Sequence, residues 1–323
     1  MTTISAFMEE NFKHFNARET LEAARAWREL LDKGGRMLLA MAGAMSTAEI
    51  GISLARMIRE DKVHAISATA ANLEEDIFNL FSNKEYKMVP HYRDLTPEQE
   101  RELRDQGFNR VTDTCIPESV MIHIEKILLD NWREAAAKGK PKFPWEFMYE
   151  LLKTPGIERY FQIPPEHSWV YAAMEKGIPI YTPGFEDSTL GNVYCADVMR
   201  GKIPSHHGVR TGTEQMEHLA EWYQKQVEDG APVGFFQIGG GIAGDFAICV
   251  VPMLIQDVKK KDTPYWAYFA QIGDSTTSYG SYSGAVPNEK ITWHKLDTDT
   301  PRFMINSDAS IVAPLIFMYV LGE

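Results

Sequence analysis

The sequence predicts an α/β fold, in which a mostly parallel sheet is flanked by helices and preceded by an N-terminal helical extension over residues 1–35. Two observations carry this prediction. Short apolar runs at 36–42 and 63–68 are each followed by a turn and an amphipathic run, and repeated strand–turn–helix units are typical of parallel sheets with crossover helices. A glycine-rich turn over 239–244 lies between a further apolar strand and an apolar helix, which repeats the same unit.

The N-terminal extension is expected to hold two helices within 5–33, because apolar residues such as Trp27 and Leu30 recur with a helical period. A glycine pair ends the second helix and leads into the first strand. After that strand, Ser46 or its neighbour is suited to cap a helix that runs through Arg59.

The remaining elements follow from apolar periodicity and from turn residues at their ends. The middle of the chain is expected to be mostly helical. The expected strands span 36–42, 63–68, 178–181, 233–238, 265–272 and 303–306. The expected later helices span 117–136, 144–153, 165–176, 213–229 and 309–321, with others from about 188 and from the triple glycine to about 258. No repeat or linker-like stretch interrupts the series, so we expect one α/β domain over 1–323.

Composition narrows the classes of partner. The net charge of −12 argues against nucleic acid, because no excess of basic side chains is present to neutralise phosphates. No stretch reaches the ~20 apolar residues of a membrane span, and the first residues lack the pattern of a signal peptide. Cys115, Cys195 and Cys249 fit neither a disulfide framework nor a zinc spacing. We therefore expect a cytoplasmic protein with reduced thiols and no membrane or nucleic-acid partner.

The pair His206-His207 invites a metal interpretation. Adjacent residues on a strand point to opposite faces, and no third ligand lies at a helical spacing from them. We therefore expect no metal site.

The run Gly239-Gly-Gly-Ile-Ala-Gly244 matches the G-x-G-x-x-G pattern between a predicted strand and a predicted helix. Glycines at such a turn allow backbone N–H groups to approach a pyrophosphate at the helix N-terminus. Asp274, at the end of the next strand, is a possible ribose ligand. The alternative is a tight turn that binds nothing.

Acidic residues follow other predicted strands. Three of them lie within Thr69–Asp76, where they complement a helix dipole or bind a ligand at the carboxyl edge of the sheet. Asp187 and Asp308 also follow strands. Parallel strands bring such turns to one edge, which favours a shared site over separate helix caps.

The most informative stretch lies at 281–295, where Glu289, Trp293 and Lys295 follow a glycine-rich turn. A neutral lysine in a dry pocket is a nucleophile, and an indole face beside a carboxylate can hold an organic cation. These residues indicate amine chemistry. The alternative is an edge strand with an exposed lysine.

With these residues in view, the chain resembles the deoxyhypusine synthase family. The segments that carry the likeness are 43–48, 69–76, 187–191, 239–241, 283–295 and 307–310. The resemblance implies a Rossmann-like, doubly wound fold and a homotetramer with sites at dimer interfaces. It implies that Lys295 forms an imine with the substrate, and that Glu75, Glu289 and Trp293 line a polyamine pocket. The resemblance and the turn positions together predict NAD binding by Ser46, Thr69, Ala70, Asp187, Gly239, Gly240, Gly241, Asp274, Ser283 and Asp308.

The chain departs from the family pattern around the expected polyamine. The family carries a Lys-His-His run where this chain has Gly244, Asp245 and Phe246. Asn192 and Tyr282 stand where the family uses acids. We still assign Asp245, Asn192 and Tyr282 to the substrate pocket, and Asp245 or the neighbouring His294 is a candidate replacement for the family histidine.

The expected function is an NAD-dependent aminoalkyl (aminobutyl) transferase that acts on polyamines through a lysine imine, with a small amine as acceptor. The lost polar residues leave alternatives open. The chain could be a catalytically inactive, NAD-binding homologue, or a true deoxyhypusine synthase that modifies translation factor 5A. An NAD-dependent amine oxidoreductase or hydrolase is a weaker alternative.

Overall fold

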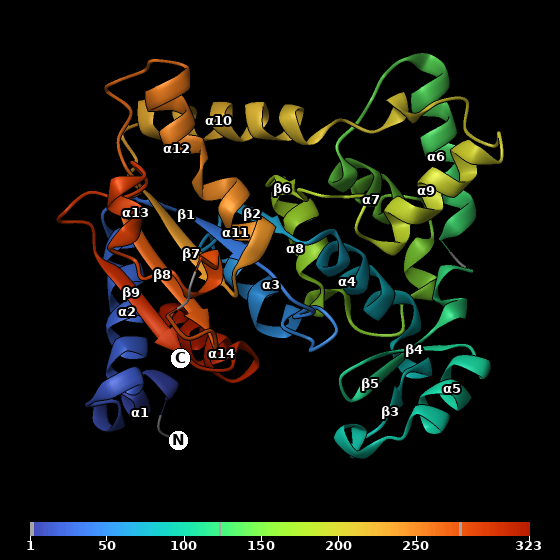
Figure 1. Cartoon of the computed structure of the whole chain (residues 1–323), viewed down its shortest axis with the longest axis horizontal. Helices are drawn as coiled ribbons and strands as arrows, with labels where there is room; N and C mark the ends of the chain where they lie inside the picture. Colours follow the sequence, from blue (N-terminus) through green and yellow to red (C-terminus); the bar gives the residue numbers. More distant parts are fainter. Residues whose placement is uncertain (1–2, 123, 278–279) are drawn as a thin grey trace.

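The computed structural model describes residues 3–122, 124–277 and 280–323. Its centre is a six-stranded parallel sheet in the order β6-β2-β1-β7-β8-β9 (Figure 1). The strands are β1 Arg36–Met41, β2 Ala65–Ala68, β6 Ile180–Tyr181, β7 Val233–Ile238, β8 Tyr268–Gly273 and β9 Arg302–Asn306. The chain order along the sheet reverses between β1 and β7. In open sheets of this kind, ligands bind outside the carboxyl ends of the strands at that reversal.

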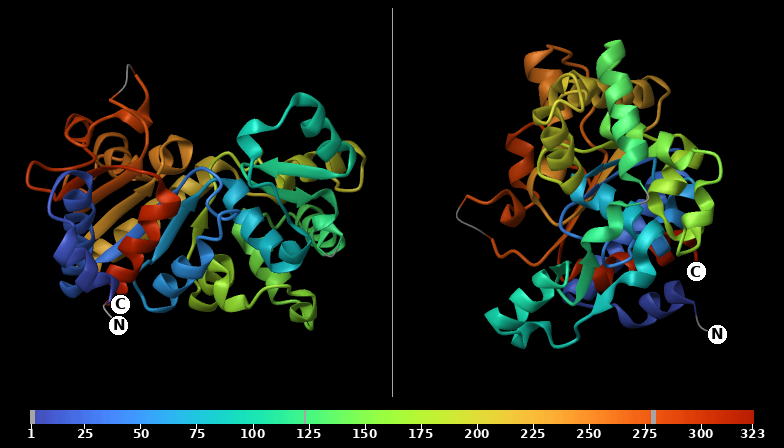
Figure 2. Two further views of the ribbon diagram at one scale, coloured as in Figure 1. Left: turned by 90° about the horizontal axis from the view of Figure 1, so that it is seen from below. Right: turned by 90° about the vertical axis from the view of Figure 1, so that its right-hand side faces the viewer.

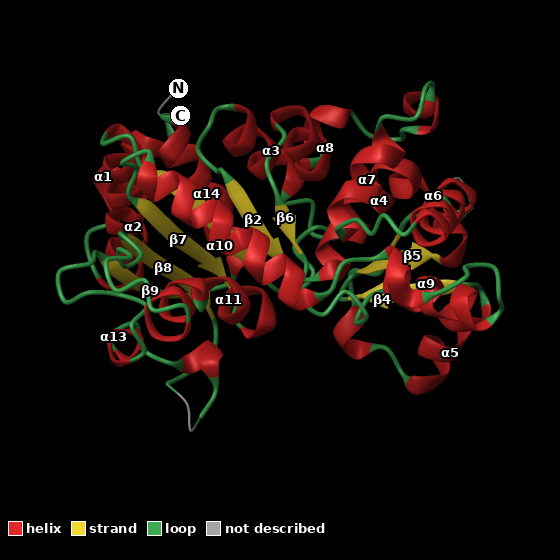
Figure 3. Ribbon diagram, turned by 90° about the horizontal axis from the view of Figure 1, so that it is seen from above, coloured by secondary structure: helices red, strands yellow, loops and turns green. Residues whose placement is uncertain are grey.

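The sheet is covered by helices on both faces, which confirms the predicted doubly wound α/β fold (Figure 3). Along β1, Leu39 packs into one hydrophobic core and Leu38 into the other, because successive strand residues point to opposite faces. The helices on the first face include α2 (Phe15–Asp32), α3 (Gly51–Arg59) and α14 (Ala309–Leu321). Those on the second face include α10 (Gly212–Glu228), α11 (Gly241–Ile248) and α12 (Val250–Pro252).

The predicted helical extension is present as α1 (Ile4–Asn11) and α2. It packs against the last helix of the chain, α14, so both ends of the chain lie together (Figure 1). The backbone N–H of Ser5 donates to the carbonyl of Glu323 at 2.7 Å. The single-domain organisation over 1–323 stays a prediction.

The middle of the chain lies beside the main sheet, beyond β6 (Figures 1 and 2). Its helices are α4 (Ala70–Ser82), α5 (Pro97–Asp105), α6 (Glu125–Lys138), α7 (Pro144–Leu152), α8 (Trp169–Lys176) and α9 (Thr189–Met199). This part also contains an antiparallel sheet in the order β3-β5-β4, which sequence analysis missed. Its strands are β3 Lys87–Met88, β4 Phe108–Val111 and β5 Thr114–Pro117. Strands of two to four residues show too little alternation to be separated from loops.

Several expected boundaries were wrong. The helix expected from Ser46 begins only at Gly51, after a series of turns. The helix expected to run from the triple glycine to about 258 is broken: α11 ends at Ile248, and a short α-helix and a π-helical turn follow it. His206 and His207 lie in a 3-10 turn rather than a strand.

The part of the chain that the structure describes was searched for metal sites and for membrane-spanning helices. It contains no cluster of three or more His, Cys, Asp or Glu side chains that could hold a metal ion. None of its helices is both long and apolar enough to cross a membrane.

Candidate active site

The predicted cofactor residues lie in the turns that follow the strands of the main sheet. Ser46 follows β1, Thr69 and Ala70 follow β2, and Asp187 follows β6. The triple glycine follows β7, and Asp274 and Asp308 follow β8 and β9. Because all strands run parallel, these turns share the carboxyl edge of the sheet.

The triple glycine forms a cradle that only glycine can occupy. Gly239 and Gly241 have φ angles of +73° and +65°, a region that side chains disfavour. A Cβ on Gly240 would lie 2.0 Å from the Oγ atom of Ser283, so that loop packs directly on the backbone. A Cβ on Gly241 would meet nothing within 4 Å. The cradle opens α11 at the point where the strand order reverses, and therefore fits the pyrophosphate of a dinucleotide.

Some predicted cofactor residues already form hydrogen bonds within the protein. Ser46 is fully buried, and its hydroxyl donates to the carbonyl of Asn72 at 2.7 Å and accepts from Trp169 Nε1 at 2.9 Å. The Thr69 hydroxyl caps α4 by accepting from the backbone N–H of Asn72. Asp308 caps α14 by accepting from the Ser310 hydroxyl at 2.6 Å and from the Ser310 backbone N–H at 2.7 Å, and these hydrogen bonds lower its pKa.

Lys295 lies in a cavity of about 320 Å³ on the α11 face of the sheet. The lysine is only 7% exposed, and its Nζ atom lies 2.9 Å from Asp245 Oδ1 and 5.2 Å from the centroid of the Tyr282 ring. Glu289 and Trp293 also line this cavity. Trp293 is 63% exposed, which places it at the mouth of the cavity rather than inside it.

A second cavity, of about 630 Å³, holds the other predicted pocket residues. Its lining includes Glu75, Asp187 and Asn192, together with residues of β4 and β5. None of the residues that the structure describes lines both cavities. Figure 1 shows the reason: α13 (Glu289–Thr292) lies beside β8, whereas α4 and α9 lie beyond β6.

The three acids of α4 have different roles. Glu74 caps α9 by accepting from the backbone N–H groups of Thr189 and Leu190 at 2.9 and 2.7 Å. Asp76 is buried and accepts from the Ser168 hydroxyl and from backbone N–H groups at the start of α8. These acids therefore cap neighbouring helices, and do not complement the dipole of their own helix.

Glu75 lies between these two capping acids and faces the second cavity. Its Oε2 atom is buried without a hydrogen-bond partner among the described residues. Burial raises the pKa of Glu75 to about 7; the nearby Thr47 hydroxyl opposes this increase, and repulsion by Glu74 adds to it. Glu75 is therefore the acid of the three whose carboxylate is left for a ligand.

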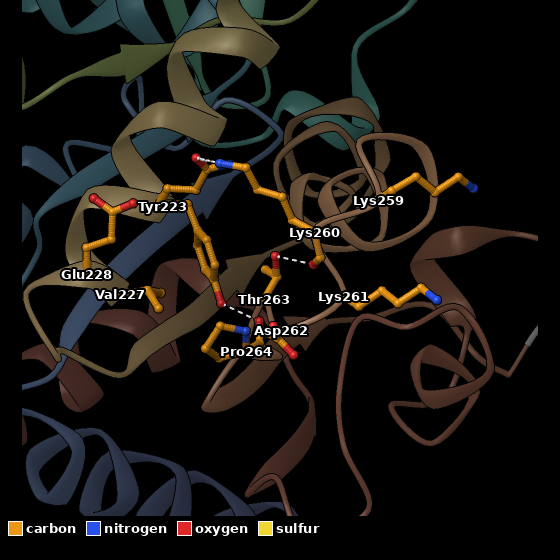
Figure 4. Close-up of a pocket in the computed structure, with 10 residues that line it drawn as sticks. Tyr223, Val227, Glu228, Lys259, Lys260, Lys261, Asp262, Thr263 and Pro264 are labelled. Atoms are coloured by element: carbon orange, nitrogen blue, oxygen red, sulfur yellow. Dashed lines mark hydrogen bonds between the residues drawn. The ribbon is translucent and has the colours of Figure 1, made fainter.

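A third cavity, of about 530 Å³, lies between the end of α10 and the loop 259–264 (Figure 4). None of the predicted site residues lines it. The loop leads into β8, so this cavity adjoins the amino ends of the strands, away from the edge at which such sheets bind ligands. Lys260 is already hydrogen-bonded to Gln224 there, at 2.6 Å.

Comparisons with known proteins identify the family of this chain. The family model described as "Deoxyhypusine synthase" matches residues 6–320. The chain belongs to the deoxyhypusine synthase family. It is 28% identical over 331 residues to a "Deoxyhypusine synthase-like protein" of Nostoc punctiforme, which covers 98% of this chain and 79% of the relative. It is 25% identical over 321 residues to a protein of the same description from Elusimicrobium minutum, covering 97% and 79%.

A solved structure supports the fold. The "putative deoxyhypusine synthase" of Entamoeba histolytica superposes with a TM-score of 0.58 at 13% identity, covering 98% of this chain and 92% of that one. At this identity the likeness concerns the fold alone.

Three of the departures from the deoxyhypusine synthase pattern, at Gly244, Asp245 and Tyr282, lie together around Gln237 and Lys295. The Tyr282 hydroxyl donates to Oε1 of the buried Gln237 at 2.8 Å, so this phenol is directed into the fold and does not replace an acid in the cavity. A Cβ on Gly244 would lie 2.6 Å from the Gln237 side chain, so Gly244 makes room for that glutamine. Asp245, the next residue, forms the ion pair with Lys295.

The two candidate replacements for the family histidine are placed differently. Asp245 lines the Lys295 cavity, but His294 is not among its lining residues. The His294 ring instead stacks on Tyr265, with the Tyr265 hydroxyl 3.5 Å from Nδ1. The geometry favours Asp245 over His294.

Asn192 does not occupy the position of a free acid. Its side-chain amide donates to the carbonyl groups of Glu186 and Ser188 at 2.9 and 2.7 Å. It therefore stabilises the turn that carries Asp187 and the start of α9, at the rim of the second cavity.

Sequence reasoning missed Lys290. This lysine is 3% exposed and lines the same cavity as Lys295. Its Nζ atom lies 4.8 Å from the ring centroids of both Phe269 and Tyr282. No signal in the sequence distinguishes it, because a lysine after Glu289 is also what an exposed helical turn would contain.

Proposed function

We propose that this chain is an NAD-dependent aminoalkyl transferase that acts on di- or polyamines through an imine on Lys295. The observation that carries the proposal is the position of Lys295: a buried lysine with an aromatic face and a carboxylate beside it, in a cavity that shares the loop of Ser283 with the glycine cradle. The cavity places the Lys295 amine beside a carboxylate that can take its proton, and the burial of its side chain limits the access of water to an imine formed there.

The chain's own residues fit NAD at the carboxyl edge of the sheet. Gly239, Gly240 and Gly241 would hold the pyrophosphate, with Ser283 against Gly240. We assign the ribose hydroxyls to Asp187, Asp274 and Asp308, of which Asp308 also caps α14. When bound there, NAD would supply a hydride acceptor for a carbon next to an amine nitrogen and, once reduced, a hydride donor for the final imine.

In this proposal Lys295 carries the aminoalkyl group between donor and acceptor. Lys295 first releases a proton to Asp245, and its neutral amine then attacks the imine carbon of the oxidised donor. The leaving nitrogen takes up a proton, and its bond to carbon breaks as the new imine on Lys295 forms. Asp245 holds Lys295 in place at 2.9 Å before the attack. The Tyr282 ring offers its face to a cationic chain, and Glu289 and Trp293 flank the entrance.

The acidic cavity of Glu75 is proposed to complete the site from a second copy of the chain. The Lys295 cavity has few carboxylates for a polyamine, whereas Glu75 and Glu118 line the other one. A homotetramer with sites at dimer interfaces would bring the two cavities together. The test mixes two inactive variants, Lys295→Ala and Glu75→Gln. If each site combines the Lys295 cavity of one chain with the Glu75 cavity of another, mixed assemblies contain some intact sites and should regain activity.

We propose a small amine as the acceptor in place of a protein lysine, because two acid positions of the family carry no carboxylate in this chain. Tyr282 turns its hydroxyl into the fold, and the Asn192 amide is occupied by backbone carbonyls. A cytoplasmic location is part of this proposal, since the net charge of −12 and the reduced cysteines are consistent with it.

Trapping with borohydride tests the proposal. The protein is incubated with NAD and a panel of di- and polyamines, reduced, digested, and searched by mass spectrometry for an added aminoalkyl group. We expect the adduct on Lys295 and a transferred product in the unreduced reaction, with neither in Lys295→Ala. No adduct with any amine, together with the same products from Lys295→Ala, would refute the transferase.

The second candidate is a catalytically inactive, NAD-binding homologue. The observation in its favour is the ion pair between Lys295 and Asp245, because a paired ammonium is not a nucleophile. Tight NAD binding by calorimetry without turnover of any amine would support this candidate. Labelling of translation factor 5A would instead identify a true deoxyhypusine synthase, and net NADH accumulation would identify an oxidoreductase.

A further inference from the structure

The cavity of Lys295 contains a second amine. Lys290 lies at 3% exposure, and its Nζ atom is buried without a hydrogen-bond partner in the described part of the chain. Lys295, by contrast, is paired with Asp245. The two lysines face the same aromatic ring, with Nζ atoms 4.8 and 5.2 Å from the centroid of Tyr282.

An unpaired lysine at this depth is not explained by packing. A buried ammonium is costly unless it is paired, and a methionine would fill similar space without that cost. The face of an aromatic ring offers only a weak partner for the charge. Burial without a partner therefore favours the neutral form of the Lys290 amine, and a neutral amine can act as a base.

We propose that Lys290 is the acid–base residue of this cavity, accepting a proton from the nitrogen of a bound substrate ammonium and later returning it to the departing amine. This inference rests on the proposed transferase function. Asp245, which stands in the segment of the family histidine, is paired with Lys295, so in this proposal Lys290 takes the role of the base and Asp245 positions Lys295.

The proton balance of the proposed step is simple. One N–H bond of the substrate ammonium breaks, its electron pair stays on the substrate nitrogen, and a new N–H bond forms on Lys290. No oxidation or reduction accompanies this transfer. When the donor fragment departs from the carbon attacked by Lys295, the Lys290 ammonium returns the proton to its nitrogen, and the base is regenerated.

The charged and titratable groups around Lys290 are consistent with this role. Lys295 repels its charged form, whereas Glu289 and Asp245 favour that form. Tyr282 and Cys249 also line the cavity, and burial raises the pKa of each, so both are neutral near pH 7. Desolvation outweighs the carboxylates and lowers the pKa of Lys290 to about 8, within the range useful for a base.

The first measurement needs neither cofactor nor turnover. Lysines labelled with ¹³C at Cε are titrated by NMR, and the Lys290 signal is assigned by its loss in Lys290→Arg. We expect a midpoint near pH 8, compared with about 10.4 for an ordinary lysine in a model peptide. A midpoint above 10 would overturn the proposal whatever the protein catalyses.

The second measurement is imine formation with an ω-aminoaldehyde and cyanoborohydride, which bypasses NAD. We expect the adduct on Lys295, formed at least tenfold more slowly in both Lys290→Met and Lys290→Arg, with an altered pH profile. Lys260→Met, in the cavity of Figure 4, serves as the matched control and keeps the wild-type rate.

Each contrary result has a distinct meaning. A wild-type rate in Lys290→Arg would show that only the positive charge matters, and an adduct on Lys290 itself would make it the nucleophile; either overturns the proposed base. A third outcome separates the two proposals. If Lys290 titrates near pH 8 and its variants form the adduct more slowly, but no amine is transferred with NAD, the transferase function is refuted and the role of Lys290 as a base is supported.

Discussion

The Tyr282 hydroxyl donates a 2.8 Å hydrogen bond to Oε1 of Gln237, a residue buried in the middle strand of the main sheet. Tyr282 stands at a position where the family has an acid, and this hydrogen bond directs its hydroxyl into the core. Only the face of its ring is presented to Lys290 and Lys295. Tyr282 therefore replaces a family carboxylate, and its ring is also the one that contacts the buried Lys290.

The first prediction tests this hydrogen bond. Tyr282→Phe leaves Oε1 of Gln237 buried without a donor, and should lower the free energy of unfolding by roughly 1–3 kcal/mol while keeping the ring in place. Urea denaturation measures the change. Tyr265→Phe is the control, because that hydroxyl makes only a 3.5 Å contact with His294 and its loss should cost much less. Equal effects of the two variants would contradict the proposed importance of Gln237.

The second prediction concerns the glycine cradle. Gly240→Ala places a methyl group 2.0 Å from Ser283 Oγ, so the loop 281–284 must move away from α11. We expect at least tenfold weaker NAD binding by calorimetry. Gly212→Ala is the control, since a Cβ at the start of α10 meets nothing within 4 Å and the residue has no positive φ. Undiminished NAD affinity in Gly240→Ala would rule out the cradle as the dinucleotide site.

The third prediction separates the acids of α4 by pH. The pKa of Glu75 is raised to about 7 from its ordinary value of 4.5, so the folded state holds a proton that the unfolded state releases between these values. Stability from this group therefore falls as pH rises from 4.5 to 7. Glu75→Gln should raise the free energy of unfolding at pH 8 by about 1–3 kcal/mol and have no such effect at pH 4.

Glu74→Gln is the matched comparison. Its carboxylate accepts two backbone N–H groups at the start of α9, and an amide supplies only one acceptor oxygen. This variant should be destabilised by roughly 0.5–2 kcal/mol at pH 8. If both variants shift thermal unfolding in the same direction at pH 8, the division between a capping acid and a ligand-binding acid is wrong.

The fourth prediction concerns the stability cost of Lys290. Its pKa is lowered to about 8 from 10.5, so between these values the unfolded state binds more protons and stability rises with pH. Below pH 8 the folded protein carries the full cost of the buried charge. Lys290→Met should therefore raise the free energy of unfolding at pH 7 by about 1–3 kcal/mol, with the gain disappearing above about pH 10.5. A stabilisation that is unchanged from pH 7 to pH 11 would indicate better packing instead of the removal of a charge.

The sequence was sufficient to predict the strands of the main sheet, because apolar runs and turn residues within each segment mark them. β7 is buried along its whole length and α14 is apolar up to a glycine cap, so both bounds were predicted as observed. Sequence analysis missed the sheet of β3, β4 and β5, because its strands are short and two of them are not fully buried. Their pairing depends on neighbours that local periodicity does not report.

For the candidate site, the sequence by itself determined which residue types are present: a triple glycine after a strand, acids after other strands, and Lys295 near Glu289 and Trp293. Only the tertiary structure decided their roles. It left Glu75 facing a cavity while Glu74 and Asp76 cap other helices, and it buried Lys290 beside Lys295. The physical reason is that burial and hydrogen-bond partners are supplied by segments distant in the chain, and these decide whether a charged group caps, pairs or stays free to react.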